Sequence, residues 1–403
     1  MGYFPEEIDH ADIYNRRSKI TALAQQHLAM QRNNRRLKRM LDVAIIGAGL
    51  SGLSLAERLF DGNRNIAVFE ARDRCGGRIL SHSITSASGD SAFEVDLGPT
   101  WLWPGHQPRI TALAARLGLE LFRQWDRGHS LYQIDHDEAP LMFTDAETSD
   151  SAAWRIKGGC RQLTDGLLQR LPDSMLHLQH RLLKLTDRES YVDLEFATGN
   201  GQTFYQAKQV VLAVPPRLLA DSVVFEPELA LKLVRLMQDT PTWMAGHAKA
   251  ILVYQTAFWR GLGYSGNALL PYPGAVLAEV HDACSEQDGT AALFGFFGLS
   301  AVTRERYRDN LEDLVVQQMT RLFGAAAANP LQIIVQDWSL EPFTSTQHDH
   351  APLTSHPVYG HRSLCLDHWQ DKLYFCGTET AQAAGGYLEG ALEASDRVFT
   401  AIN

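Results

Sequence analysis

Two glycine-rich segments that lie more than 300 residues apart constrain the fold of this chain more than any other feature. The first, Gly47-Ala-Gly49-Leu-Ser-Gly52, lies between a short apolar run and a helical pattern, and the next apolar run ends at Glu70. Strand, tight turn, helix and strand in this order are typical of the βαβ unit that binds a dinucleotide. The second segment, 373–391, also contains a strand-like run followed by glycines, and we predict that it completes the same site.

The residues of the first segment have separate physical roles. Gly47 permits the tight turn, Gly49 lets backbone N–H groups approach a pyrophosphate, and Gly52 lets the helix pack close to the strand. The N-terminus of that helix faces the negative charge of the phosphates. Glu70 can accept hydrogen bonds from ribose hydroxyls, and its charge disfavours a 2′-phosphate and therefore NADP. The motif alone does not distinguish NAD from FAD.

Composition narrows the class of protein. The chain has 403 residues and a formal net charge of -10, which disfavours nucleic acid as the main partner. Its five cysteines include no closely spaced pair, so we expect neither a disulfide framework nor a metal site. No apolar run reaches about 18 residues, and no apolar stretch follows Arg16-Arg17, so we predict neither a transmembrane span nor a signal peptide. We expect a soluble, cytoplasmic protein without a transmembrane anchor.

Residues 1–40 differ from the rest, with eight Lys or Arg against four Asp or Glu. Apolar residues at near-helical spacing predict a helical extension that packs on the body of the protein. A basic patch for a membrane, a polyanion or a protein partner is the alternative. Beyond residue 40, hydrophobic periodicity predicts strands at 42–46, 65–69, 176–178, 182–185, 191–196, 209–214, 247–255 and 291–299, and helices at 53–60, 108–119, from about 157, and at 301–323.

The stretch Glu70-Ala-Arg-Asp-Arg-Cys-Gly-Gly-Arg78 resembles the extended fingerprint of FAD-dependent amine oxidases of the monoamine and polyamine oxidase family. Further segments resemble that family in the same order along the chain, namely 94–103, 157–163, 210–216, 248–260, Trp338 and 377–391. The resemblance implies an α/β fold with a Rossmann-like FAD-binding domain (41–100, 156–243 and 338–403) and a smaller α+β substrate domain (101–155 and 244–337).

The resemblance assigns cofactor binding to residues from several segments, namely Gly47, Gly49, Leu50, Ser51, Gly52, Glu70, Ala71, Arg72, Gly77, Arg78, Gly98, Pro99, Thr100, Trp101, Leu182, Gly377, Thr378, Glu379, Gly386, Tyr387, Leu388 and Ala391. Some family members attach FAD to a cysteine a few residues after the tryptophan that matches Trp338. Residues 339–350 contain no cysteine, so we expect FAD to bind noncovalently. Some members carry a C-terminal membrane helix, and we expect this chain, whose sequence reaches Asn403, to lack it.

Four residues are the candidates for the reacting end of the site. By resemblance, Lys249 holds a water against the flavin and assists the reaction with oxygen, while Trp338 packs near the flavin. Tyr387 matches one of two aromatic rings that flank the amine, a surrounding that suits an amine. The second ring is expected after Trp338, where Phe343 and His348 are candidates and His348 fits the offset better.

The resemblance implies oxidation of an amine to an imine by FAD, with oxygen reduced to hydrogen peroxide. The flavin supplies this chemistry, and the protein supplies orientation and electrostatics. Two alternatives stay open: an L-amino-acid oxidase or desaturase on the same scaffold, and a flavoprotein that acts on a polypeptide partner as a maturation factor. The related L-amino-acid oxidases use an arginine just after the segment that matches 94–103 to hold the substrate carboxylate. Here the first arginine after that segment is Arg109, which favours amines over amino acids as substrates. A homodimer is a further expectation.

Overall fold

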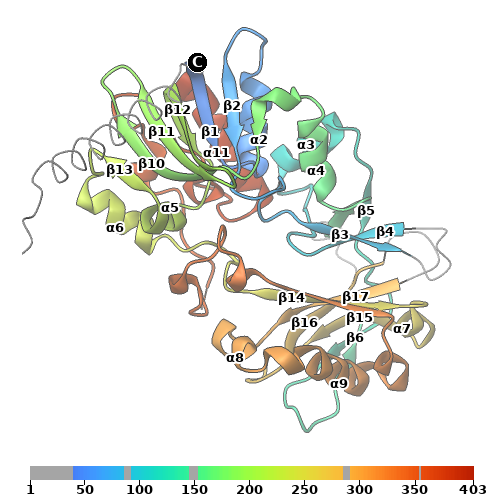
Figure 1. Cartoon of the computed structure of the whole chain (residues 1–403). Coiled ribbons are helices and arrows are strands. Elements are labelled where there is room, and N and C mark those ends of the chain that lie inside the picture. Colours follow the sequence, from blue (N-terminus) through green and yellow to red (C-terminus); the bar gives the residue numbers. More distant parts are fainter. Residues whose placement is uncertain (1–39, 86–91, 145–152, 285–290, 354) are drawn as a thin grey trace, which may run out of the picture.

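The computed structural model describes residues 40–85, 92–144, 153–284, 291–353 and 355–403. The predicted helical extension therefore lies outside the described residues, except for Met40. The described chain forms two bodies, each built on one large sheet, as Figure 1 shows. The mixed sheets and the helices confirm the predicted α/β fold class.

The first sheet has eight strands in the order β13-β10-β11-β12-β1-β2-β9, with β19 paired to β12. Its strands are β1 (Leu41–Ile46), β2 (Ile66–Phe69), β9 (Leu176–His177), β10 (Arg181–Asp187), β11 (Val192–Thr198), β12 (Gly201–Leu212), β13 (Val224–Glu226) and β19 (Leu373–Phe375). Strands β1, β2 and β19 run parallel to the end of β12. The predicted strand at 209–214 is thus only the end of the longer β12, whose first part forms an antiparallel hairpin with β11.

Helices cover both faces of this sheet, which is why the residues of β2 are buried without alternation. One face packs against α2 (Leu50–Leu59), α3 (Pro108–Arg116), α4 (Arg161–Leu168) and α11 (Leu388–Ile402). The other face packs against α5 (Pro216–Ser222) and α6 (Leu231–Asp239). The last helix, α11, lies beside α2, so the two glycine-rich segments meet at one edge of the sheet.

The second sheet has seven strands in the order β18-β14-β17-β16-β15-β6-β7. They are β6 (His129–Tyr132), β7 (Leu141–Phe143), β14 (Ala248–Tyr254), β15 (Tyr264–Leu269), β16 (Leu277–Asp282), β17 (Ala291–Phe297) and β18 (Gln332–Asp337). One face packs on α9 (Leu311–Phe323), and the other contacts the hairpin of β3 (Ser81–Thr85) and β4 (Ala92–Asp96). A short pair, β5 (Leu121–Arg123) and β8 (Trp154–Ile156), and the helical turns α7 (Phe258–Gly261) and α10 (Arg362–Cys365) complete the larger elements.

The prediction of one helix over 301–323 is wrong. The segment divides into α8 (Ala301–Arg306) and α9, with a 3₁₀ turn at Arg308–Asn310 between them. Tyr307 leaves the helical region at φ −106°, and Asn310 precedes α9 at φ −119°. The helical pattern of apolar residues therefore continues across two residues whose backbone is not helical, and the apolar periodicity alone did not show this break.

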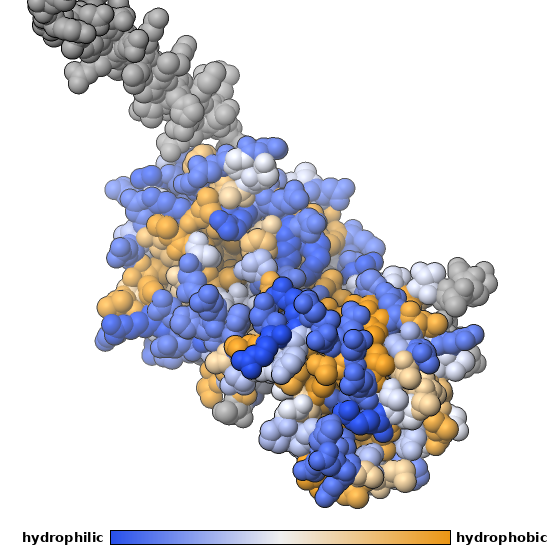
Figure 2. Space-filling view, turned by 60° about the horizontal axis from the view of Figure 1, so that its bottom comes forward, coloured by the Kyte–Doolittle hydropathy of each residue, from blue (hydrophilic) through white to orange (hydrophobic). Residues whose placement is uncertain are grey.

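None of the described helices is both long and apolar enough to cross a bilayer. Figure 2 shows hydrophilic and apolar side chains interspersed over one face. The exposed large apolar side chains include all three residues of β7.

Candidate flavin and amine site

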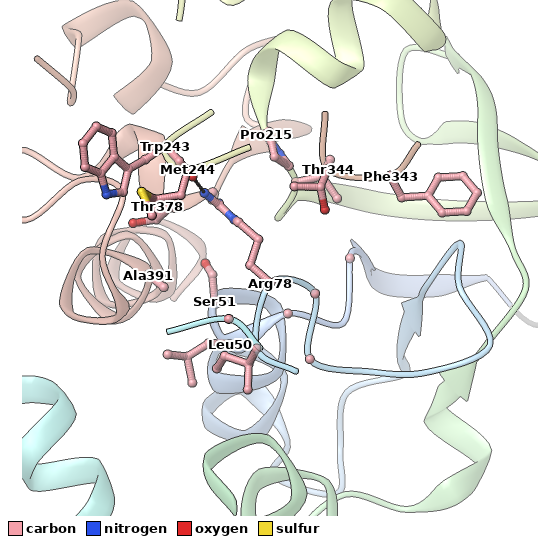
Figure 3. A pocket seen from close by; sticks show the side chains of 18 of the residues that line it. Leu50, Ser51, Arg78, Pro215, Trp243, Met244, Phe343, Thr344, Thr378 and Ala391 are labelled. Carbon is pink, nitrogen blue, oxygen red and sulfur yellow. Dashed lines mark hydrogen bonds between the residues drawn. The ribbon is translucent and has the colours of Figure 1, made fainter. Parts of the chain in front are cut away.

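A cavity of about 520 Å³ lies where the two sheets face each other. It is lined by the end of β1, the start of α2, the end of β2 and residues 377–379 beside the first sheet. Residues 97–101, with β14 and β17 residues of the second sheet, form the rest of this lining. Figure 3 shows Arg78 reaching across it toward Trp243, with Leu50 and Ser51 on one side and Phe343 and Thr344 at the far end. All the predicted cofactor residues line this cavity except Gly52, which lies behind the turn.

Backbone packing explains why the turn needs its glycines. Gly47 has a φ of +105°, and a Cβ there would lie 2.6 Å from the carbonyl oxygen of Ala213. A Cβ on Gly52 would lie 2.0 Å from the oxygen of Gly47. Gly49 is different, because a Cβ there would meet only the oxygen of Gly76, at 4.0 Å. The protein therefore leaves room at Gly49 on the wall of the cavity.

Glu70 is buried and braces this turn from the end of β2. Its Oε2 accepts from the backbone N–H of Ala48 at 2.9 Å, and its Oε1 accepts from the N–H of Arg72 at 3.0 Å. An ionised carboxylate has about four acceptor sites, so lone pairs remain for a molecule in the cavity. The guanidinium of Arg72 donates to Glu341 and Thr344 and so ties this edge to the segment after Trp338.

Glu379 brings the second glycine-rich segment to the same wall. It is completely buried, and its Oε1 accepts from Arg78 at 2.7 Å. Its Oε2 has no hydrogen-bond partner within the described residues, although it is buried at the wall of the cavity. Buried carboxylate oxygens are nearly always hydrogen-bonded, so this atom fits a donor on a bound molecule. The open wall at Gly49, the free lone pairs of Glu70 and this oxygen together fit a dinucleotide.

Lys249 is the second residue of the fully buried strand β14, and it lines the other end of the cavity. Its Nζ donates to the carbonyl oxygens of Asp96 (2.8 Å) and Gly98 (2.9 Å) and lies 2.7 Å from Thr100 Oγ1. The Phe294 ring centroid lies 4.4 Å from the same Nζ. Burial lowers the pKa of Lys249 to about 7, and the nearby negative charge of Asp96 opposes this shift.

Two of the remaining candidates also line the cavity. Trp338 is buried, and its indole N–H donates to the Leu97 carbonyl oxygen at 3.0 Å, which fixes the loop that carries Gly98 and Thr100. Tyr387 is 40% exposed and stacks on His356, with ring centroids 4.9 Å apart and an interplanar angle of 3°. Trp243 completes this group, with its ring centroid 4.5 Å from that of His356.

The expectation that His348 faces the substrate beside Tyr387 is not met. His348 lines a separate recess of about 80 Å³, together with Arg217 and Arg304. The reason is the 3₁₀ turn Gln347–Asp349, which Asp349 locks by accepting from Thr346 and from Arg217. This turn directs the chain away from the cavity. Phe343, the other candidate, does line the cavity.

Trp243 and His356 lie beside Tyr387, although no sequence pattern predicted them at this site. The sequence offered one indication, the glycine pair directly before Tyr387. In the structure, a Cβ on Gly386 would lie 2.9 Å from the Cβ of Trp243 and 3.2 Å from Nε2 of His356. The glycine pair before Tyr387 therefore marks a place where other side chains approach the backbone closely. Nothing in the sequence identified those side chains as Trp243 and His356.

Comparison with known proteins identifies the family. The model of the flavin containing amine oxidoreductase family matches residues 50–148 and 143–403. The chain belongs to this family. Flavin-containing amine oxidase B of Sus scrofa is 25% identical over 464 residues, covering 90% of this chain and 86% of that protein. Probable flavin-containing monoamine oxidase A of Dictyostelium discoideum is 22% identical, covering 90% and 97%.

Solved structures show the same fold. Putrescine oxidase bound to putrescine matches with a TM-score of 0.73 at 20% identity, covering 90% of this chain and 98% of that one. Cyclohexylamine oxidase from Brevibacterium oxydans IH-35A matches with a TM-score of 0.71, also at 20% identity. The protein is thus a flavin-containing amine oxidoreductase by family, and the recognition of that family from the sequence is confirmed.

Proposed function

We propose that the protein oxidises an amine to an imine, with FAD as the two-electron acceptor and with oxygen reduced to hydrogen peroxide. The observation that carries this proposal is the position of Lys249, a buried lysine with a pKa of about 7 at the wall of a cavity that fits a dinucleotide. A lysine so placed titrates near neutral pH, where a group that exchanges protons with reactants is most effective.

The residues of the chain would divide the work between holding the cofactor and orienting the amine. Glu70, Gly49 and Glu379 line the part of the cavity that would hold the dinucleotide. FAD held there would supply the two-electron acceptor for oxidation of the amine, and the imine would hydrolyse in water to a carbonyl compound and ammonia or an amine. Trp243 and Tyr387 would orient the amine with their aromatic faces.

Noncovalent binding of FAD is part of the proposal. No cysteine lines the cavity within the described residues. Burial raises the pKa of Cys75 and of Cys376 to about 11, so both are protonated thiols at neutral pH. A thiol must ionise to act as a nucleophile, and these two are therefore poor candidates for a covalent bond. A cytoplasmic location, a homodimer and a protein partner for residues 1–39 stay predictions.

A panel of substrates tests the function. Purified yellow protein is mixed without oxygen with monoamines, polyamines, L-amino acids and a carotenoid-like lipid, and the flavin absorbance is followed. We expect amines to bleach it and admitted oxygen to restore the colour with one hydrogen peroxide per flavin. Bleaching by amino acids or by the lipid alone would favour the oxidase or desaturase alternative, and no bleaching would favour the polypeptide partner. Acid precipitation of the same preparation should leave the colour in solution.

A further inference from the structure

Lys249 has no N–H left for a molecule in the cavity when it is charged. An ammonium group has three N–H donors. The protein supplies three acceptors within 2.9 Å of Nζ, the carbonyl oxygens of Asp96 and Gly98 and the Oγ1 of Thr100. The lysine is only 1% exposed. Direct donation from Lys249 to a reactant would therefore require one of these bonds to break.

Thr100 is the member of this group that can connect Lys249 with the cavity. It lines the cavity and is 4% exposed. In the part of the chain that the structure describes, its hydroxyl has one hydrogen bond, the one to Lys249. A hydroxyl has one donor and two acceptor positions, so a Thr100 that accepts from the ammonium keeps its own O–H for another acceptor. The two carbonyl acceptors of Lys249 have no proton to pass on.

The loop that carries Thr100 is held in place from three sides. Trp338 donates to the carbonyl of Leu97, and Lys249 donates to that of Gly98. A Cβ on Gly98 would lie 2.0 Å from the carbonyl oxygen of Arg78, so the loop packs directly on the flavin-binding segment. Thr100 is thus fixed relative to both Lys249 and the cavity.

We propose that Thr100 relays a proton from Lys249 Nζ to oxygen as it is reduced in the cavity. The O–H bond of Thr100 breaks toward the reduced oxygen while an N–H bond of Lys249 breaks and a new O–H bond forms on Thr100. Lys249 becomes a neutral amine that accepts from the Thr100 hydroxyl, and the reverse path restores its proton from water or from the ammonium group of the next amine. The stoichiometry of this step rests on the proposed function. One O₂ molecule, one hydride equivalent from the amine and one proton give one molecule of hydrogen peroxide.

The groups around Lys249 make both of its states accessible. Burial and the positive charge of Arg155 on β8 favour the neutral lysine, while the negative charge of Asp96 on β4 favours the charged one. Cys160 before α4 is the other titratable group beside Lys249, and burial raises the pKa of its thiol well above the usual value. The Asp96 carboxylate accepts from Ser81 Oγ at 2.6 Å and from the Cys160 N–H at 2.8 Å, so it is held in position. Phe294 and Phe296 on β17 cover Nζ from the other side.

Replacement of the hydroxyl tests the relay. The reduced holoprotein is mixed with oxygen, and the reoxidation rate is measured across the pH range around 7 for wild type, Thr100→Val and Thr100→Ser. We expect Thr100→Val to slow reoxidation about 10-fold or more and to remove its pH dependence, and Thr100→Ser to restore both. Rates in Thr100→Val that match wild type at every pH would overturn the relay.

Two measurements keep the test decisive if Thr100→Val binds flavin poorly or the protein oxidises no amine. In mixtures of H₂O and D₂O, chemically reduced wild type should reoxidise with a curved dependence on deuterium content, because two protons move together, and a linear dependence would contradict the relay. The absorbance of resting flavin should titrate near pH 7 in wild type and in Thr100→Ser but not in Lys249→Met. Failure of the amine panel overturns only the proposed function, since neither measurement needs an amine.

Discussion

The two ends of the cavity differ in whether backbone or side chains form their walls. The end that we propose holds the dinucleotide consists mostly of backbone, where Gly47, Gly49 and Gly52 lie within six residues of one another. The other end consists of side chains from distant elements, among them Lys249 on β14 and Tyr387 before α11. Backbone packing at Gly47 and Gly52 leaves no room for an added atom, whereas a side-chain wall depends on how the intervening turns direct the chain. The first end should therefore be sensitive to a single methyl group, and the second to chemistry and charge.

The largest effect should follow a methyl group at Gly52. In Gly52→Ala the new Cβ would lie 2.0 Å from the Gly47 oxygen, so α2 must separate from β1. We expect a loss of at least about 3 kcal/mol in unfolding free energy, at the upper end of what overpacking costs. Gly199→Ala is the matched control, because its Cβ would meet nothing within 4 Å, and it should change stability by about 0.5 kcal/mol or less. Urea unfolding measures both, and equal losses would contradict the packing argument.

Gly49→Ala separates stability from cofactor binding at the same turn. A Cβ there would meet no protein atom closer than 4.0 Å, so the apoprotein should unfold within about 1 kcal/mol of wild type. The methyl group would instead occupy space on the cavity wall that the cofactor needs. We expect the dissociation constant for FAD to rise about 100-fold, which corresponds to about 2.7 kcal/mol. Titration of apoprotein with FAD provides the number, and an unchanged constant would show that the wall is wider than the structure indicates.

The same contrast explains what the sequence could predict. The βαβ unit was located to within a few residues, because its contacts join neighbours in the chain and each glycine has a local cause. Glu70 was found for the same reason. Lys249 was found by resemblance to a family pattern, and nothing in its own neighbourhood of apolar residues shows that Asp96, Gly98 and Thr100 surround it.

The predictions of the side chains beside Tyr387 failed where the chain makes a turn. Counting residues from Trp338 placed His348 at the second aromatic position, but counting assumes that no turn intervenes. Asp349 stabilises such a turn and accepts a hydrogen bond from Arg217, which lies 132 positions away in the chain. No local sequence pattern predicts a contact between residues so far apart. The approach of His356 to Tyr387 likewise depends on how the segment before Gly360 folds back over Gly386.

The charge of Lys249 should give the smallest effect, and its sign distinguishes a buried titrating lysine from an exposed one. The pKa of Lys249 is about 7 in the folded protein and about 10.5 in the unfolded chain, so below pH 7 both states carry the proton and the cost of burying the charge is fully present. Between these values the unfolded chain binds more protons, and wild type should gain stability relative to Lys249→Met by at most about 1.4 kcal/mol per pH unit.

Urea unfolding of wild type and Lys249→Met from about pH 6 to about pH 9 measures this difference. We expect a constant difference below pH 7 and a gain for wild type of about 2 kcal/mol by pH 9. A difference independent of pH would mean that the three acceptors around Nζ hold the lysine charged throughout, with the folded-state pKa near that of the unfolded chain. Lys249 would then be a fixed cation at the side-chain end of the cavity, and Thr100 would have no proton to pass from it.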